Sequence, residues 1–203
     1  PETVIADSGS TPQYISFFSG VNRDAQPFSL MLFLSGGMGA ASDADGPHCS
    51  PFPSNPVPGS VEVTESLVPL VIWKKELRPD SGGPGRYRGG CGQDIVIEMT
   101  SPKRTELSMI SERWDFPAQG LHEGQAGGRA RAVRTAPDDS VLPEKGRTVL
   151  DPGDVIKLTT AGGGGFGPPG ERDTGRVLDD LRNELISEDA AGAVYGLDLR
   201  DRQ

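Results

Sequence analysis

The stretch "DSGGPGRYRGGCG" at residues 80–92 contains six glycines, one proline and two arginines. Such a composition excludes a regular helix or strand, because glycine weakens both and proline lacks a backbone N–H donor. It predicts a tight connection between two strands, in which glycine adopts positive φ or lets another backbone approach closely. In this interpretation the arginines are solvated or paired to carboxylates. For Arg88 the candidates are Asp80 and Asp45, and Asp94 is a further partner for the arginines.

The same stretch also fits an anion site. Successive backbone N–H groups can form a nest for an anion, and Arg88 can add a forked hydrogen bond to a phosphate or carboxylate. It is not a P-loop, because no Gly-Lys-Ser/Thr follows it, and it lacks the βαβ context of a dinucleotide fingerprint. We expect the stretch to act first as a scaffold and second as a wall of a substrate pocket.

A second glycine-rich stretch is "AGGGGFGPPGERD" at residues 161–173. Its four consecutive glycines suit a loop that wraps a ligand, and the following helix start would favour an anion nearby. A flexible connection between a strand and a helix explains the same composition. The residues leave both interpretations open.

Composition and charge narrow the class of protein. The chain has 203 residues, with 28 glycines, 18 prolines and a formal net charge of −9. The apolar runs between the glycine clusters favour a folded protein over a disordered one. An acidic surface repels a phosphate backbone, so no nucleic-acid partner is expected. No apolar run reaches the length of a membrane span, and no signal peptide is visible, so we expect a cytoplasmic location without membrane contact.

The hydrophobic pattern predicts an α+β fold that is predominantly β, with glycine-rich strand connections and a C-terminal amphipathic helix. The expected division is a β-rich region over 1–170 and a helical segment over 171–203. The helix is placed at 174–186 with Asp173 as its N-cap, followed by a short second helix capped by Ser187. The expected strands are a hairpin of 13–19 and 28–34, one or two strands in 61–77, then 93–101, 104–114 and one within 151–167, with a long loop at 35–60.

No metal site is predicted from this sequence. Its only His and Cys residues are His48, Cys49, Cys91 and His122, and none of them forms a recognised ligand spacing. Two cysteines are too few for a disulfide scaffold.

Seven blocks in one order resemble the C-terminal part of the hydantoinase B family, which also forms the second half of 5-oxoprolinase and one subunit of acetone carboxylase. The blocks are "GGMGA" at 36–40, "DG" at 45–46, "SNPVPGSVEVTE" at 54–65, "ELRPDSGGPGRYRGGCG" at 76–92, "SERW" at 111–114, "PGDVIKLTTAGGGGFG" at 152–167 and "ERDTGRVLDDLRNELIS" at 171–187.

The resemblance implies part of an ATP-dependent enzyme that hydrolyses a cyclic amide through a phosphorylated intermediate. The alternatives are a ketone carboxylase subunit or an assembly module without a reacting group. It also implies a hetero-oligomer with a hydantoinase A-like, ATP-binding subunit and with the N-terminal half of the hydantoinase B-like subunit. ATP and a divalent metal are expected in those parts. Because the chain starts at Pro1 without Met, we expect a fragment that is inactive alone.

No catalytic residue can be carried over from the resemblance. An activated phosphate ester needs oriented donors, and the backbone N–H groups of 81–85 and 162–165 are candidates. Asp45 is a candidate to hold a loop or a substrate hydroxyl, whereas Glu65 is expected to be a surface carboxylate. The candidate substrate-binding residues are Asp45, Ser81, Gly82, Gly83, Arg88, Gly163 and Gly164.

Overall fold

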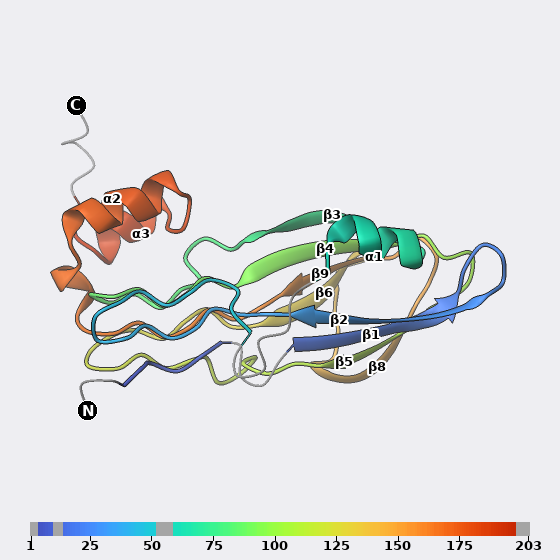
Figure 1. The fold of residues 1–203 in the computed structure, drawn as a ribbon, viewed down its shortest axis with the longest axis horizontal. Coiled ribbons are helices and arrows are strands. Elements are labelled where there is room, and N and C mark those ends of the chain that lie inside the picture. Colours follow the sequence, from blue (N-terminus) through green and yellow to red (C-terminus); the bar gives the residue numbers. More distant parts are fainter. Residues whose placement is uncertain (1–3, 10–13, 52–58, 198–203) are drawn as a thin grey trace.

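The structure, a computed structural model, describes residues 4–9, 14–51 and 59–197. It is mostly β, as predicted, with two antiparallel sheets and short helices (Figure 1). The strands are β1 (Tyr14–Val21), β2 (Pro27–Leu34), β3 (Leu70–Leu77), β4 (Gln93–Met99), β5 (Thr105–Ile110), β6 (Arg131–Ala136), β7 (Ser140–Val141), β8 (Lys145–Leu150) and β9 (Val155–Thr159). The helices are α1 (Val61–Leu67), α2 (Thr174–Arg182) and α3 (Glu188–Ala193), with a 3-10 turn at Pro169–Glu171.

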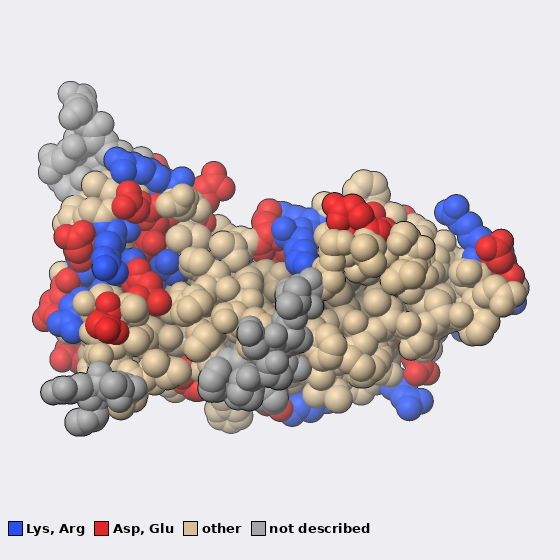
Figure 2. Space-filling model, in the orientation of Figure 1, with Lys and Arg blue, Asp and Glu red and all other residues tan. Residues whose placement is uncertain are grey.

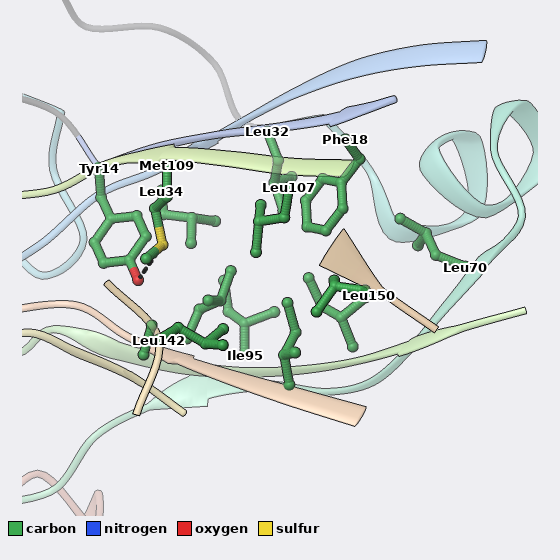
Figure 3. Close-up of a cluster of buried hydrophobic side chains, with 14 of the residues drawn as sticks. Tyr14, Phe18, Leu32, Leu34, Leu70, Ile95, Leu107, Met109, Leu142 and Leu150 are labelled. Carbon is green, nitrogen blue, oxygen red and sulfur yellow. Dashed lines mark hydrogen bonds between the residues drawn. The ribbon is translucent and has the colours of Figure 1, made fainter. Parts of the chain in front are cut away.

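The two sheets pack face to face around one apolar core. One sheet has the order β2-β1-β5-β8, and the other has the order β3-β4-β9-β6-β7. Figure 3 shows their inward side chains meeting, with Phe18 and Leu107 on one side and Ile95 on the other. Every second residue of β4, namely Ile95, Ile97 and Met99, is almost fully buried, because successive strand residues point to opposite faces.

The hairpin expected at 13–19 and 28–34 is confirmed within the described residues as β1 and β2. Tyr14 pairs with Leu34 at one end and Val21 with Pro27 at the other. The strands expected at 93–101, 104–114 and within 151–167 are confirmed as β4, β5 and β9, although β4 ends at Met99 and β5 ends at Ile110. Residues 52–58 of the expected loop at 35–60, and residues 198–203 of the expected helical segment, lie outside the described residues. The division at residue 170 stays a prediction.

The strand prediction for 61–77 is correct only in its second half. Residues 61–67 form α1, because the Ser60 hydroxyl caps the helix by accepting from the Val63 amide at 3.3 Å. Glu65 lies near the surface and accepts from the amide of Ile72 at the start of β3. The strands β6, β7 and β8 were not expected, because their many charged and small residues hide the alternation.

The C-terminal helices are confirmed, with one correction to their bounds. Asp173 caps α2 by accepting from the Arg176 amide, and Ser187 caps α3 by accepting from the Ala190 amide. The helix expected at 174–186 ends at Arg182, because Glu184 adopts a φ of 56° and leaves the helical path. Of the residues that the structure describes, no helix has the length and apolar character needed to cross a membrane.

Candidate functional site

Residues 161–167, which continue β9, run through the centre of a bundle of extended backbone segments. Figure 1 shows these segments side by side between the sheets and the end of the molecule that carries α2 and α3. Each of the surrounding segments exchanges backbone hydrogen bonds with the central one. They are 5–9, 36–40, 81–85, 87–90, 118–121 and 124–128.

The central glycines donate to different neighbours in turn. The amide of Gly163 donates to the carbonyl of Gly90, and the amide of Gly164 donates to that of Asp7, both at 2.9 Å. The amides of Gly162 and Gly165 both donate into 124–128. Gly162 and Gly165, three residues apart, thus share one neighbour, and three residues is the period of a polyproline II helix.

Glycine is required here because the backbones touch. A Cβ on Gly163 would overlap the carbonyl oxygen of Met38, and one on Gly82 would overlap that of Gly89. A Cβ on Gly83 would lie 2.7 Å from the amide nitrogen of Gly165. None of the glycines in 80–92 has a positive φ, so close backbone approach explains them. In the second stretch Gly167 has a φ of 74°.

Several backbone N–H groups of the two glycine-rich stretches have hydrogen-bond partners within the bundle. The amides of Gly83 and of 162–165 donate to backbone carbonyls at 2.7–2.9 Å. These five donors, among the amides of 81–85 and 162–165 that were candidates for an anion, are therefore bonded within the chain. Ser81 is equally committed, since its hydroxyl donates to the Arg78 carbonyl and accepts from the Gly92 amide.

Arg88 is held by a carboxylate, but not by either expected one. Its Nε donates to Asp180 Oδ2 at 3.0 Å and its Nη2 donates to Asp180 Oδ1 at 3.2 Å. Its Nη1 donates to the Gly89 carbonyl. Asp45 contacts the residue differently, by accepting from the Arg88 amide at 2.7 Å.

Asp80 and Asp94, which were also expected to pair with the arginines, have other partners. Asp80 accepts from the Ser187 amide at the start of α3 and donates its own amide to the Leu185 carbonyl. Asp94 pairs with Lys157 at 2.7 Å and accepts from the Thr159 hydroxyl. Neither carboxylate pairs with Arg88, because that guanidinium is turned towards α2.

Arg172 completes a buried network of two arginines and two aspartates. Its two terminal nitrogens donate to the two oxygens of Asp45 at 2.7 and 2.9 Å, and Nη2 also donates to Asp180 at 2.7 Å. Arg88, Arg172 and Asp180 are each at most 6% exposed. The network joins the 42–47 loop, the 80–92 stretch and α2. Figure 2 shows acidic and basic side chains gathered over this end of the molecule.

The network shifts the pKa values of its members and neighbours. Burial raises the pKa of Asp45, but the hydrogen bond and charge of Arg172 outweigh it, so the pKa lies below its usual value. Burial opposes the charge of Arg172, yet Asp45 and Asp180 hold its pKa above the usual value. Burial, followed by the charge of Arg88, lowers the pKa of His48. His48 is fixed because its Nδ1 accepts from the Cys91 amide at 2.9 Å.

The structure brings the seven candidate residues together, but mostly inside the protein. Ser81, Gly82, Gly83, Arg88, Gly163 and Gly164 are buried. Asp45 differs from the other candidates because its side chain is 27% exposed. It is therefore the candidate that reaches the surface.

Sequence reasoning missed Asp180 and Arg172. A signal existed for Asp180, because it lies beside Val177 and Leu181 on the apolar face of α2, where a charged residue requires a buried partner. Arg172 precedes the helix cap and carries no such signal. Among the described residues, no group of three or more His, Cys, Asp or Glu side chains is placed to hold a metal ion.

Comparisons with known proteins place this chain in a family. Residues 1–169 match the family described as hydantoinase B/oxoprolinase. Caprolactamase subunit beta of Pseudomonas jessenii is 30% identical over 186 residues, which cover 87% of this chain and 32% of that protein. The acetone carboxylase alpha subunit of Xanthobacter autotrophicus is 28% identical over an alignment that covers 98% of this chain and 30% of that protein.

A solved structure shows the same fold. The crystal structure of the ATP-dependent caprolactamase from Pseudomonas jessenii superposes with a TM-score of 0.82 at 24% identity, covering 98% of this chain and 36% of that one. The chain thus spans about a third of the length of these relatives. From the match over residues 1–169, the chain belongs to the hydantoinase B/oxoprolinase family.

Proposed function

We propose that this chain is the C-terminal portion of a hydantoinase B-like subunit in an ATP-dependent enzyme that hydrolyses a cyclic amide. The substrate class comprises hydantoins, 5-oxoproline and lactams, and the reaction proceeds through a phosphorylated intermediate. The observation that carries the proposal is the similarity to caprolactamase subunit beta over 87% of the chain. The family match over residues 1–169 supports it.

Within that enzyme, we assign this chain a scaffold role at the edge of the substrate pocket. The buried amides and charged groups already have partners within the chain, so they stabilise a rigid body. We assign Asp45 to the pocket wall, because its carboxylate is fixed by Arg172 and partly exposed. In this proposal the reacting groups come from elsewhere in the complex.

We further propose that ATP binds to a hydantoinase A-like subunit, and that the divalent metal binds there or in the N-terminal region of the hydantoinase B-like subunit. The similarity to an ATP-dependent caprolactamase supports a role for ATP in the complex. A hetero-oligomer supplied with cellular ATP is expected to work in the cytoplasm.

A carboxylase of the acetone carboxylase type is the second candidate. It is supported by the similarity to an acetone carboxylase alpha subunit over 98% of this chain. The two enzymes differ in the co-substrate that consumes the activated intermediate, which is water in one case and bicarbonate in the other.

The test is to purify the complex that contains this chain, identify its subunits by mass spectrometry and measure phosphate release from ATP. Release that depends on a cyclic amide, without a need for bicarbonate, supports the proposal. Release that depends on a ketone and bicarbonate together supports the carboxylase. A complex that responds to neither set of substrates, or that lacks an ATP-binding partner, overturns both.

A further inference from the structure

A pocket of about 530 Å³ lies where the second sheet meets the glycine bundle. Its lining includes Arg78, Arg129, Arg131 and Lys157, although the chain as a whole is acidic. Arg78 follows β3 directly, and Arg131 of β6 is paired with Thr159 of β9. Sheet pairing and the bundle therefore bring cations from distant parts of the sequence to one place.

Arg78 is held rigidly at this pocket. Its amide donates to the Gly92 carbonyl at 2.9 Å, and its carbonyl accepts from the Ser81 hydroxyl at 2.6 Å. Its guanidinium lies over Gly128, where any Cβ would overlap Nη2, and Nη1 donates to the Arg129 carbonyl at 2.9 Å. A guanidinium carries five N–H donors, and Nη1 of Arg78 is the one with a hydrogen-bond partner among the described residues, which leaves donors for a ligand.

The positive charge of the pocket is only partly balanced. Lys157 is neutralised by Asp94 at 2.7 Å. Within the part of the chain that the structure describes, Arg78, Arg129 and Arg131 form no ion pair. Burial lowers the pKa of Arg78, although Asp94 and Cys91 oppose the shift, which is the mark of a cation short of counter-charge. Asp115 is the remaining carboxylate in the lining.

We propose that this pocket binds a phosphate group, with Arg78 as its fixed anchor and Arg129 and Arg131 as flanking donors. Three unpaired arginines against Asp115 leave two positive charges, which match a phosphate dianion. The planar fork of arginine suits two phosphate oxygens at once. Trp114 and Val141 also line the pocket and give it an apolar wall, so a phosphate carried by a small organic molecule fits as well as the free ion. This inference does not depend on the proposed function.

The test is calorimetric titration of the full chain with inorganic phosphate and with phenyl phosphate near neutral pH, against sodium chloride of equal ionic strength. Arg129→Gln and Arg131→Gln change exposed side chains and should each weaken binding about tenfold, the effect of losing a charged hydrogen bond. Arg78→Lys should also weaken it, because an ammonium lacks the fork. The matched control is Arg147→Gln on β8, whose side chain is 77% exposed, and it should leave binding within about twofold.

The two probes separate the two sources of the phosphate group. Tighter binding of phenyl phosphate identifies an organic monoester that contacts Trp114, and tighter binding of inorganic phosphate identifies the free ion. Either result supports the site. The proposal is overturned if chloride reproduces the binding heat, or if Arg147→Gln weakens binding as much as Arg131→Gln does.

Discussion

Arg88 and Asp180 form a buried ion pair with two hydrogen bonds, of 3.0 and 3.2 Å. Their side chains are 4% and 8% exposed. The pair fixes α2 to the glycine-rich stretch, although α2 and α3 have a small apolar cluster of their own around Val177, Ile186 and Ala191. That cluster contains only residues of the C-terminal segment, so the attachment of the helices to the glycine-rich stretch depends on this buried charge and on the hydrogen bonds of Asp80 with Leu185 and Ser187.

Replacing Arg88 with Lys should destabilise the protein, because an ammonium keeps the charge but cannot form both hydrogen bonds. We expect the free energy of unfolding to fall by about 2 kcal/mol, less than for complete loss of a buried partner. Urea denaturation measures it. The control is Arg182→Lys, whose exposed partner is Asp179 and whose effect should stay within about 0.5 kcal/mol. Equal losses in both variants would contradict a special role for the buried pair.

Asp180→Asn should loosen the C-terminal helices before the sheets. The change leaves Arg88 and part of Arg172 buried without counter-charge, which favours local opening. Amide hydrogen exchange should accelerate in α2 and α3 while β4 and β9 stay protected. A uniform rise across both sheets would show instead that the network stabilises the whole chain.

The network also predicts how stability changes with pH. In the folded protein the pKa of Asp45 lies below its ordinary value of 3.8. As the pH falls towards 3.8 the unfolded chain binds more protons than the folded one, so the contribution of Asp45 is lost on further acidification through the folded pKa. Asp45→Asn should therefore be less stable at neutral pH and lose less stability in acid. Thermal unfolding over an acidic pH series tests this, and an unchanged slope would refute it.

His48 should also lower the stability of the protein as the pH falls, but over a higher pH range than Asp45 does. Its pKa is lowered from 6.5 by burial and then by Arg88, so below about 6.5 the unfolded chain binds the proton more readily and stability falls as the pH falls. His48→Asn keeps an acceptor near the Cys91 amide but cannot titrate. We expect the stability of this variant to depend less on pH below 6.5. A dependence as steep as that of the parent protein would show that His48 does not cause the loss of stability.

Both cysteines should be inert in the folded protein. Burial raises the pKa of Cys49 to about 12, and Cys91 is fully buried. Alkylation near pH 8 requires a thiolate, so iodoacetamide should modify neither residue until denaturant is added. Mass spectrometry gives the number of labels. Rapid labelling of the native protein would show that the 42–50 segment opens readily.

The sequence predicts strands such as β1, β2, β4 and β9 because apolar residues alternate clearly along them, as Ile95, Ile97 and Met99 do in β4. It misleads at 61–67, where the local alternation "VEV" looks like a strand but Ser60 caps a helix. Apolar alternation shows which side chains are buried, whereas a capping residue shows where a helix can start. A short segment such as 61–67 can satisfy both patterns.

The candidate site was predicted in part. The sequence shows that residues 80–92 and 161–167 need glycine, but not that the two stretches touch, because that contact depends on sheet pairing between β4 and β9. The same limit explains the partner of Arg88. Asp80 is near Arg88 in sequence and Asp45 belongs to a matching block, whereas Asp180 lies on a helix that folds back onto the stretch.

Gly163→Ala tests whether the glycine bundle is a scaffold or a reacting element. A Cβ at this position would overlap the carbonyl of Met38, so backbones must separate, and we expect a loss of roughly 2–4 kcal/mol in the free energy of unfolding. The control is Gly170→Ala, which meets no atom within 4 Å and does not require positive φ. In the assembled complex, turnover and melting temperature should fall together for Gly163→Ala and stay unchanged for Gly170→Ala. If turnover disappears while the melting temperature is kept, the bundle takes part directly in the reaction and its assignment as a scaffold is wrong.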